Sequence, residues 1–535
     1  MKNFRFLNHA FFKHFTFLIG LIFASYLFIF NVFGPNLNYA PGDLGDARFN
    51  IYLLEHAHQS FFIDRDVLMN YWDAPFMVPE KEVISYSDNL LGTFSIFSLF
   101  RLVGYDVYRS FQLWVITISI LNFLSAYLFL FYLFKKSLPA TIGAFIFAFS
   151  IAIASQLAHA QTFPRFPIPF IVWMSLIFFQ KKSAKYFLLL VFLIVYQFYC
   201  GIYLGFLTVV PTVILLIIGV FINWNTFKRK LLNLRYILAI SSSFILGLFA
   251  LFPLMEPYWR RSQQMNGRSF EAIVNSIPTI KSYLLYSSSS YFGRYRINFN
   301  VDDLPSFWNH AISPGYFTLF LTLFCVVFFF RKIVSKKLRM LTPLGMLGLT
   351  GLISFLLFFR IEDFSLYRLV FEIPGYSSMR AIQRIINFQL LFFGIAVAFC
   401  IHILLRSSMS VFPKFLTISF AILLLIADNF IDAEGTSRRS ISEFRAREIY
   451  LTKKLSHLEE GTVFSYEPKN VGDNPHLFHL DAMLVAQKLN LKTLNGYSAT
   501  SPSGYDAYWR NPQQESRYIW LQENVYPPFD IYVVE

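Results

Sequence analysis

The chain has 535 residues, of which 56% are hydrophobic, 15% are charged and 19% are aromatic. Soluble domains carry about a quarter charged residues, whereas here the apolar residues gather in runs of about 17–25, the length needed to cross a bilayer. This composition excludes a soluble enzyme, a disordered chain, a collagen-like fibre and a disulfide scaffold. The cysteines Cys200, Cys325 and Cys400 lie inside apolar runs, where they are expected to act as small hydrophobic residues.

The apolar runs predict about eleven transmembrane helices, and therefore an α-helical polytopic membrane protein. The first run follows a basic start but is too long for a cleaved signal peptide, so we expect it to be retained as a helix. The predicted spans cover residues 15–33, 109–134, 138–156, 166–180, 186–200, 202–222, 235–255, 314–330, 341–359, 385–405 and 411–427.

The net charge of +14 is divided unevenly between the two sides of these spans. Alternate connections hold 19 basic and no acidic residues, and the other side holds the remaining 27 basic and all 32 acidic residues. Cytoplasmic connections are enriched in Lys and Arg, so this pattern predicts a cytoplasmic N-terminus. The sequence shows no basic face on a folded domain, which argues against nucleic acid as a partner.

All large polar segments then fall outside the cytoplasm. We predict a transmembrane domain over 1–427, with outer loops 34–108, 256–313 and 360–384, and a small extracytoplasmic α/β domain over 428–535. ATP and nucleotide sugars are cytoplasmic, and the sequence contains no P-loop motif. An activated substrate would therefore have to reach this side attached to a carrier, most simply a lipid.

The first outer loop places Asp43 and Asp46 within a few residues of the membrane surface. An ionised carboxylate there can take a proton from an attacking hydroxyl or hold a divalent cation such as Mg or Mn. The alternative roles are structural, with Asp46 as a helix N-cap and Asp43 in an Asx-turn. The residues from Asp46 onward predict an amphipathic helix along the interface. Its candidate substrate-binding residues are Arg48, Tyr52 and Glu55.

The stretch 89–104 is apolar but interrupted, and it is predicted to be interfacial or re-entrant. A later loop brings His159 and Arg165 to the surface between prolines, where Arg165 can meet a phosphate or extend to lipid headgroups. Arg380 and Arg384 are four residues apart, which places them on one face of a predicted helix. Two guanidinium groups there suit the phosphate of a lipid carrier, and interfacial anchoring is the alternative.

Four segments resemble those of a bacterial group of GT-C membrane glycosyltransferases. They are GDLGDARFNIYLLEH (42–56), SYSDNLLG (85–92), IPGYSSMRAIQRIINF (373–388) and LNGYSATSP (494–502). These segments also supply Asp88, Tyr376 and Tyr497 as candidate substrate-binding residues, beside His159. The adjacent Asp-Glu pair of several GT-C families is absent, because Ala47 follows Asp46. The choice between Asp43 and Asp46, and the use of a metal, therefore stay open.

The resemblance implies a transferase of hexosyl or pentosyl units that uses a polyprenyl-phosphate sugar on the extracytoplasmic face. Its acceptor would be a lipid-linked or cell-envelope glycan. The role of base would fall on Asp46 or Asp43, and the carrier phosphate would be held by Arg380, Arg384 and Arg165. Direct displacement with inversion fits this set of groups, because arginines stabilise a departing phosphate.

Three other functions are compatible with this sequence. A transporter or flippase of lipid-linked glycans would place polar groups in broken helices near the bilayer midplane, whereas the acidic groups here lie in loops, apart from Asp428 at the end of a predicted span. A non-catalytic GT-C relative would act as a scaffold of envelope assembly. A polysaccharide polymerase or ligase would use the same carrier with a whole oligosaccharide.

Overall fold

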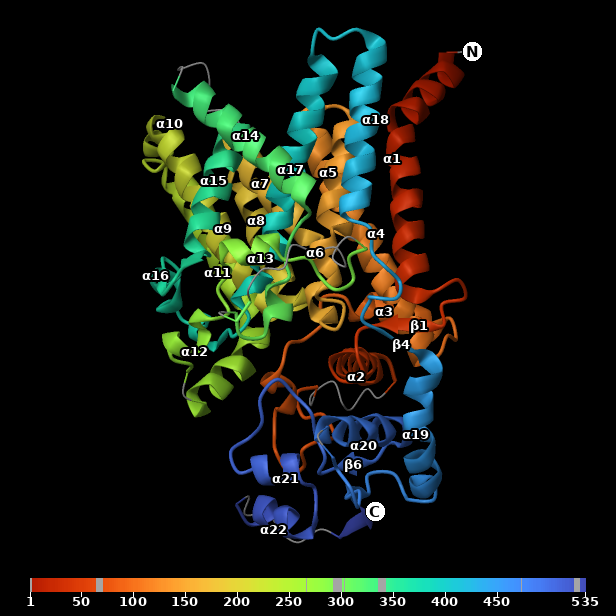
Figure 1. Cartoon of the computed structure of the whole chain (residues 1–535). Coiled ribbons are helices and arrows are strands. Elements are labelled where there is room, and N and C mark those ends of the chain that lie inside the picture. The colour runs from red at the N-terminus through yellow and green to blue at the C-terminus, as the bar shows by residue number, and fades with distance from the viewer. Residues whose placement is uncertain are drawn as a thin grey trace.

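The computed structural model of the chain is mostly helical (Figure 1). It describes residues 2–63, 71–265, 267–291, 301–302, 304–334, 343–472, 474–523 and 530–535.

Among these described residues, eight helical segments are long and apolar enough to cross a membrane. Each coincides with a predicted span, which confirms a polytopic helical membrane protein. The segments are Phe15–Phe33 in α1 (Lys2–Phe33), α4 (Val107–Phe134), Ser137–Ala154 with α5 (Ser137–Phe149) and α6 (Ile151–Ala154), Ala160–Lys181 with η4 (Ala160–Thr162) and α7 (Pro167–Lys181), α9 (Ile202–Ile222), α11 (Leu234–Gln264), Ile382–Arg406 with η8 (Ile382–Ile385) and α17 (Ile386–Arg406), and α18 (Val411–Asp428).

The other three predicted spans correspond to shorter apolar helical segments: α8 (Ala184–Cys200), Tyr316–Arg331 within α14 (Tyr316–Val334), and α15 (Pro343–Leu357). A helix of 15 to 17 residues, such as α15 or α8, extends only about 25 Å, against a hydrocarbon core of about 30 Å. The total of eleven spans therefore stays a prediction, and residues 341 and 342 of one span lie outside the described residues. The stretch 89–104 contains the nine-residue α3 (Phe94–Leu102), which is too short to cross.

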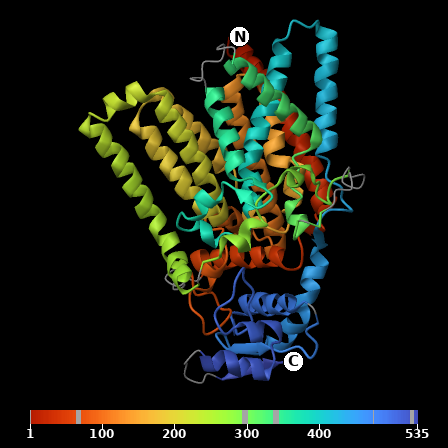
Figure 2. The same ribbon diagram turned by 60° about the vertical axis from the view of Figure 1, so that its left-hand side comes forward.

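The centre of the bundle is the contact of α5 with α1, α4 and α17. Small residues let two helices approach closely here, because a Cβ atom at Gly143 would lie 2.5 Å from the carbonyl oxygen of Gly394. The span Ser137–Ala154 is 83% buried, whereas α11 is only 17% buried. Figure 2 shows α11 leaning outward at the edge of the bundle. Its exposed Phe249 and Phe252 suit a lipid-facing surface.

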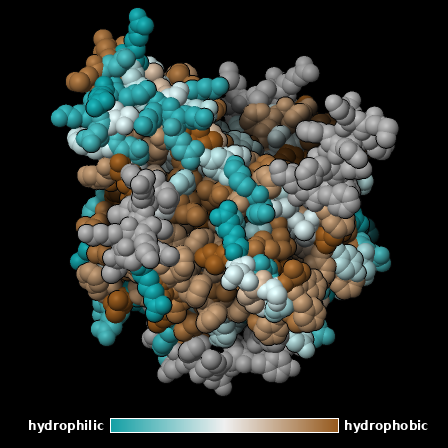
Figure 3. All heavy atoms as spheres, turned by 90° about the horizontal axis from the view of Figure 1, so that it is seen from above, coloured by the Kyte–Doolittle hydropathy of each residue, from teal (hydrophilic) through white to brown (hydrophobic). Residues whose placement is uncertain are grey.

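The two ends of the bundle differ in structure and charge. The N-terminus, α10 (Trp224–Lys230) and the connection from α17 to α18 lie at one end, and α2 (Asp46–His58) and the tail lie at the other (Figure 1). Where the structure describes them, the connections predicted to be cytoplasmic thus share the end opposite the tail. Viewed from above, hydrophobic side chains cover much of the surface between separate hydrophilic patches (Figure 3).

The tail folds back against the first loop. The strand β1 (Tyr39–Pro41) pairs antiparallel with β4 (Arg438–Ser440). After β4 comes a three-stranded parallel sheet in the order β6-β5-β7, flanked by helices. These elements are α19 (Ile441–Leu455), β5 (Val463–Tyr466), α20 (Pro475–Leu489), β6 (Lys492–Thr493), α21 (Asp506–Arg510), α22 (Gln514–Glu523) and β7 (Ile531–Val534).

The remaining loops contain only short elements. In the first loop these are η1 (Gln59–Ile63) and η3 (Val83–Tyr86). In the later loops they are α12 (Phe270–Val274), α13 (Ile280–Leu284), η6 (Phe307–His310), β2 (Arg360–Ile361), β3 (Phe364–Ser365), α16 (Arg368–Phe371) and η7 (Tyr376–Ser378).

The predicted amphipathic helix of the first loop forms as α2, but it does not lie exposed along the interface. All its residues from Ala47 to His58 are buried. α2 lies between the bundle and α20, and it contacts α3, α4, η4 and α20 (Figure 1). The tail covers α2, so that both its polar and its apolar side chains are buried. One hydrophobic cluster joins Phe49 and Leu53 of α2 to Leu480 and Met483 of α20.

Candidate active site

The two aspartates at the start of α2 have different environments. Asp43 is exposed, and its Oδ1 accepts hydrogen bonds from the backbone N–H groups of Gly45, at 3.0 Å, and Ala47, at 3.4 Å. These bonds satisfy N–H groups at the first turn of α2, where helices lack internal partners. Asp43 therefore has the structural turn role that the sequence left open. Asp46 is the first residue of α2 and is not its N-cap, a position that Gly45 occupies.

The carboxylate of Asp46 is held by two residues from distant parts of the chain. Its Oδ2 lies 2.7 Å from Nδ1 of His159, which precedes η4. Its Oδ1 accepts a hydrogen bond of 2.5 Å from the hydroxyl of Tyr497, in the loop between β6 and α21. The Asp46 and His159 side chains are 26% and 24% exposed. Both groups therefore remain open to a substrate.

The environment of Asp46 favours its ionised form. Burial raises the pKa of the Asp46 carboxyl, but the contacts with His159 and Tyr497 and the positive charge of Arg384 lower it, with a net result of about 2. Burial and the Asp46 charge raise the pKa of the Tyr497 hydroxyl well above its usual range. Tyr497 is therefore the donor in its hydrogen bond. Because an ionised carboxylate is an acceptor only, we assign a proton to His159 Nδ1, the ring nitrogen that lies 2.7 Å from Asp46.

Neighbouring contacts fix these groups in place. The Asn50 side chain on α2 donates a hydrogen bond of 3.1 Å to Gln161 in η4, which ties the segment carrying His159 to α2. The ring of Tyr497 packs edge-on against Phe49, with 5.5 Å between ring centroids. His476 of α20 lies 6.0 Å from the Tyr497 ring. Burial lowers the pKa of His476, although the Asp43 and Asp46 charges oppose this effect.

The two arginines predicted to bind phosphate lie near this carboxylate but not on one α-helical face. Arg384 is in the 3₁₀ turn η8, and Arg380 precedes that turn. The expected spacing fails because a 3₁₀ turn, rather than an α-helical turn, leads into α17. Tyr203 connects them: its ring lies 4.9 Å from the guanidinium of Arg384, and its hydroxyl accepts a 2.9 Å hydrogen bond from the Arg380 backbone N–H.

The charges of both arginines reach the site. Arg384 is buried and lowers the pKa of Asp46, as described above. Arg380 is exposed, and its charge opposes the rise in the pKa of the Tyr497 hydroxyl. A ligand phosphate beside the Asp46 carboxylate would therefore meet one exposed and one buried cation.

Arg165 does not lie at the surface, contrary to the expectation from its loop. It is 1% exposed and donates hydrogen bonds to Asn387 Oδ1, at 3.3 Å, and to the backbone oxygens of Phe147 and Ala148, at 3.2 and 3.1 Å. These bonds clamp the start of α7 to α5 and α17. A side chain this buried cannot reach a carrier phosphate without repacking, so we leave it out of the function proposed below.

Three candidate substrate-binding residues of α2 make structural contacts. Arg48 is fully buried and forms an ion pair of 2.7 Å with Asp481 of α20. Glu55 pairs with Arg101 of α3 at 2.8 Å. Tyr52 is fully buried in the cluster between α2 and the tail.

Asp88 and Tyr376 also hold backbone groups. Asp88 is buried and accepts hydrogen bonds from the N–H groups of Asn89, at 2.9 Å, and Ile202, at 2.6 Å, at the first turn of α9. Burial raises its pKa to about 6, against the effects of these bonds and of Arg384. The Tyr376 hydroxyl donates a 2.7 Å hydrogen bond to the Phe206 carbonyl.

Two residues at the site, Tyr203 and His476, were not predicted from the sequence. Neither belongs to a motif with a mechanistic pattern, and their chain segments reach the site only through the fold. Among the described residues, no group of three or more His, Cys, Asp or Glu side chains is placed to hold a metal ion. The use of Mg or Mn, which the sequence left open, stays untested, and no step proposed below passes through a metal.

No known protein-family model matches the sequence, and no curated protein matches it either. Solved structures of similar fold do exist. The chain aligns with an Archaeoglobus fulgidus oligosaccharyltransferase that was solved with a tethered acceptor peptide containing an NVT sequon, at a TM-score of 0.51 and 11% identity. This alignment covers 96% of the present chain and 68% of that protein.

The fold of this chain is similar to that of the oligosaccharyltransferase. The apo form of the Archaeoglobus oligosaccharyltransferase aligns at a TM-score of 0.49 and 12% identity, over 91% of this chain and 65% of that one. The complex of the oligosaccharyltransferase AglB from the same organism, with an inhibitory peptide and a dolichol-phosphate, aligns at 0.43 and 12%, over 96% and 69%. The chain thus spans about two thirds of the length of these proteins. At such low identity the likeness extends to the fold alone.

Proposed function

We propose that this protein is a membrane glycosyltransferase that moves a sugar from a polyprenyl-phosphate donor to a lipid-linked or cell-envelope glycan acceptor. The observation that carries the proposal is the contact of Asp46 with His159 and Tyr497. It lies beside Arg380 and Arg384, within a fold similar to that of an oligosaccharyltransferase. Sugar transfer from a lipid phosphate requires a group that accepts a proton and cations that bind the phosphate.

The distribution of charge supports an extracytoplasmic site. The basic connections of the bundle lie at the end opposite α2 and the tail (Figure 1). Basic connections face the cytoplasm in most membrane proteins. The candidate site would then lie on the extracytoplasmic face of a bacterial inner membrane. Polyprenyl-phosphate sugars are displayed on that face, and nucleotide sugars are absent from it.

The proposed reaction is a direct displacement at the anomeric carbon. The acceptor hydroxyl oxygen forms a bond to that carbon, and the bond from the carbon to the phosphate oxygen breaks with its electron pair going to the phosphate. The configuration inverts. Arg380 and Arg384 stabilise the charge that develops on the departing phosphate. Binding donor and acceptor side by side also increases the rate by proximity.

The proton of the acceptor hydroxyl passes to the Asp46–His159 pair. Both Asp46 oxygens already accept contacts, from His159 and Tyr497. With its proton on Nδ1, the His159 ring has a lone pair at Nε2, which is the atom we assign as proton acceptor. Asp46 then holds the ring orientation and stabilises the imidazolium that forms, in the manner of a carboxylate–histidine pair.

The experiment is a transfer assay in membranes with a panel of radiolabelled polyprenyl-phosphate sugars. We expect wild type to label a lipid or glycan acceptor and Asp46→Asn and His159→Gln to lose at least about 100-fold in rate, because general base catalysis supplies a factor of roughly 10²–10⁴. Asp506→Asn, at an exposed aspartate of α21, is the matched control and should keep full activity.

Monodisperse protein from each variant must first show that the loss is not one of folding. Near-normal activity in both Asp46→Asn and His159→Gln would rule out the proposed mechanism. Absence of transfer by folded wild type from every donor in the panel would remove the proposed function.

A further inference from the structure

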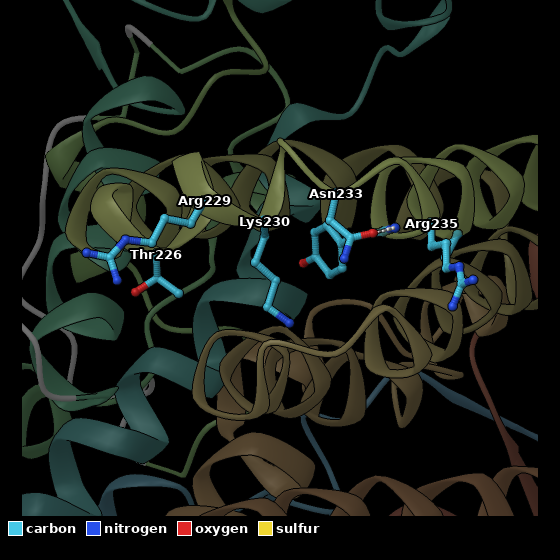
Figure 4. Close-up of a pocket in the computed structure, with 7 residues that line it drawn as sticks. Thr226, Arg229, Lys230, Asn233 and Arg235 are labelled. Atoms are coloured by element: carbon cyan, nitrogen blue, oxygen red, sulfur yellow. Dashed lines mark hydrogen bonds between the residues drawn. The ribbon is translucent and has the colours of Figure 1, made fainter.

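A basic pocket lies at the opposite end of the molecule from the candidate active site. It is formed where α10 ends and α11 begins, and its volume is about 490 Å³. The residues that line it are Thr226, Arg229, Lys230, Asn233, Arg235, Tyr236 and Ala239. Figure 4 shows Lys230 and Arg235 extending from the α10–α11 corner toward the same side.

The lining carries positive charge without a carboxylate. Arg229, Lys230 and Arg235 are all lining residues, and none of the other four is acidic. Lys182, which follows α7, adds a fourth cation, because its Nζ lies 3.3 Å from the Thr226 hydroxyl. Like charges gathered at one place repel one another, and a bound anion relieves that repulsion.

Donor groups are also available in the pocket. The Tyr236 hydroxyl is buried and has no hydrogen-bond partner. The Lys230 ammonium lies over the Tyr236 ring, 5.0 Å from its centroid. A buried hydroxyl without a partner is costly. A ligand with oxygen acceptors would satisfy this hydroxyl and the cations together.

Apolar side chains surround this corner. Trp224 is 51% exposed, Leu232 83% and Leu234 67%. Exposed leucines beside a tryptophan are typical of the boundary between headgroups and acyl chains. Continuing along α11, Leu238 is 55% exposed, so the surface that leads away from the pocket is one that hydrocarbon would cover.

We propose that this pocket binds the phosphate of an anionic phospholipid headgroup in the leaflet opposite the candidate active site. The cations and the Tyr236 hydroxyl contact the phosphate oxygens, and the acyl chains lie along exposed apolar residues of α11. Basic pockets between transmembrane helices recognise anionic lipid headgroups by this chemistry. A soluble phosphate compound would use the cations but would have no use for the apolar surroundings. The inference does not depend on the proposed transferase activity.

The test measures lipid binding to the purified full-length protein in detergent, by native mass spectrometry with phosphatidylglycerol and with phosphatidylcholine. The pocket variant is Arg229→Gln/Arg235→Gln. The matched control is Arg331→Gln/Arg406→Gln, which removes two arginines from other connections at the same end of the bundle. Thermal stability in phosphatidylcholine shows that each variant is folded.

We expect wild type and the control to bind phosphatidylglycerol preferentially. We expect the pocket variant, which lacks two cations, to bind it roughly 30-fold more weakly, since each cation near a membrane contributes about fivefold. Equal weakening in pocket and control variants would overturn the proposal in favour of diffuse attraction. Displacement of the lipid by millimolar inorganic phosphate would overturn it in favour of a soluble ligand. Equal binding of the two lipids by wild type would also overturn it.

Discussion

In the proposed mechanism His159 accepts the proton and Asp46 orients the His159 ring. A carboxyl with a pKa of about 2 is a weak proton acceptor at neutral pH, whereas general base catalysis is most efficient when the pKa of the base lies near the operating pH. Histidine is the side chain that ordinarily titrates in that range. We therefore favour the imidazole of His159 as the group that takes the proton and the carboxylate of Asp46 as the group that orients the imidazole.

The pH dependence of transfer separates the two assignments. A base must be deprotonated to act, so its activity falls as the pH drops below its pKa. If a group other than Asp46 takes the proton, we expect the rate to fall at a pH well above the pKa of Asp46. If Asp46 takes it directly, the rate should stay level down to about pH 3, because its pKa is about 2. A pH profile of kcat/KM in wild-type membranes measures this, and a level profile would exclude the imidazole.

Tyr497 contributes a hydrogen bond to the same carboxylate from the tail. We expect Tyr497→Phe to lower kcat roughly 10-fold or more, because a hydrogen bond to a charged group is worth about 1.5–3 kcal/mol. The ring packing against Phe49 should survive this change. The measurement is kcat and KM with Phe49→Leu as the packing control. An unchanged kcat in Tyr497→Phe would show that the tail only covers the site.

Between elements, α2 is joined to the tail by buried charges. Asp481 of α20 forms ion pairs with Arg48 of α2, at 2.7 Å, and with Arg447 of α19, at 2.6 Å. A buried carboxylate with two arginine partners is well compensated, and removing one partner from such a group is strongly destabilising. The joint places α2, and with it Asp46, at a defined position relative to the Tyr497 loop.

Glu448 of α19 makes the same joint sensitive to pH. It is buried and accepts a hydrogen bond from the Tyr108 hydroxyl of α4. Burial raises its pKa from 4.5 to about 7, while Arg48 and Lys488 oppose the rise. A carboxyl whose pKa is raised by folding stabilises the folded state below its ordinary pKa. That stabilisation is lost as the pH rises from about 4.5 to about 7.

We therefore expect the wild-type melting temperature, relative to that of Glu448→Gln, to fall by roughly a few degrees between pH 5 and pH 8. The glutamine keeps the shape of the side chain but cannot ionise. Thermal unfolding of the purified protein at both pH values measures the difference. Parallel pH dependence in the two proteins would show that Glu448 does not ionise in this range or is not buried in solution.

At the scale of the whole molecule, the charge distribution predicts which end faces the cytoplasm. Ser408, between α17 and α18, and Ser456, after α19, are both exposed. In spheroplasts, we expect a membrane-impermeant maleimide to label Ser456→Cys directly and Ser408→Cys only after permeabilisation. The three native cysteines give little background, because two are buried and the third is partly buried. The reverse labelling pattern would invert the topology and remove the extracytoplasmic site.

Only part of the site could be predicted, because several of its contacts join residues that are far apart in the chain. Asp46 could be singled out because an acidic residue just after a span is a local feature. Its partner Tyr497 is 451 residues away, and no local pattern connects two residues at such a separation. Arg165 was misplaced for a related reason: its flanking prolines indicate a loop, whereas its burial results from three carbonyl or amide acceptors on other helices.

The sequence by itself determined the class of the protein, the positions of the apolar helices and the sorting of basic connections to one end. These features follow from composition and local hydrophobicity, because each span in lipid must satisfy its backbone N–H and C=O groups by hydrogen bonds within its own helix. Only the tertiary structure decided that α2 is enclosed by the tail, that Arg380 and Arg384 do not share an α-helical face, and that Asp46 meets His159 and Tyr497. Those outcomes depend on packing between distant segments. The free energy of that packing depends on residues from several segments at once, so it cannot be read from any one of them.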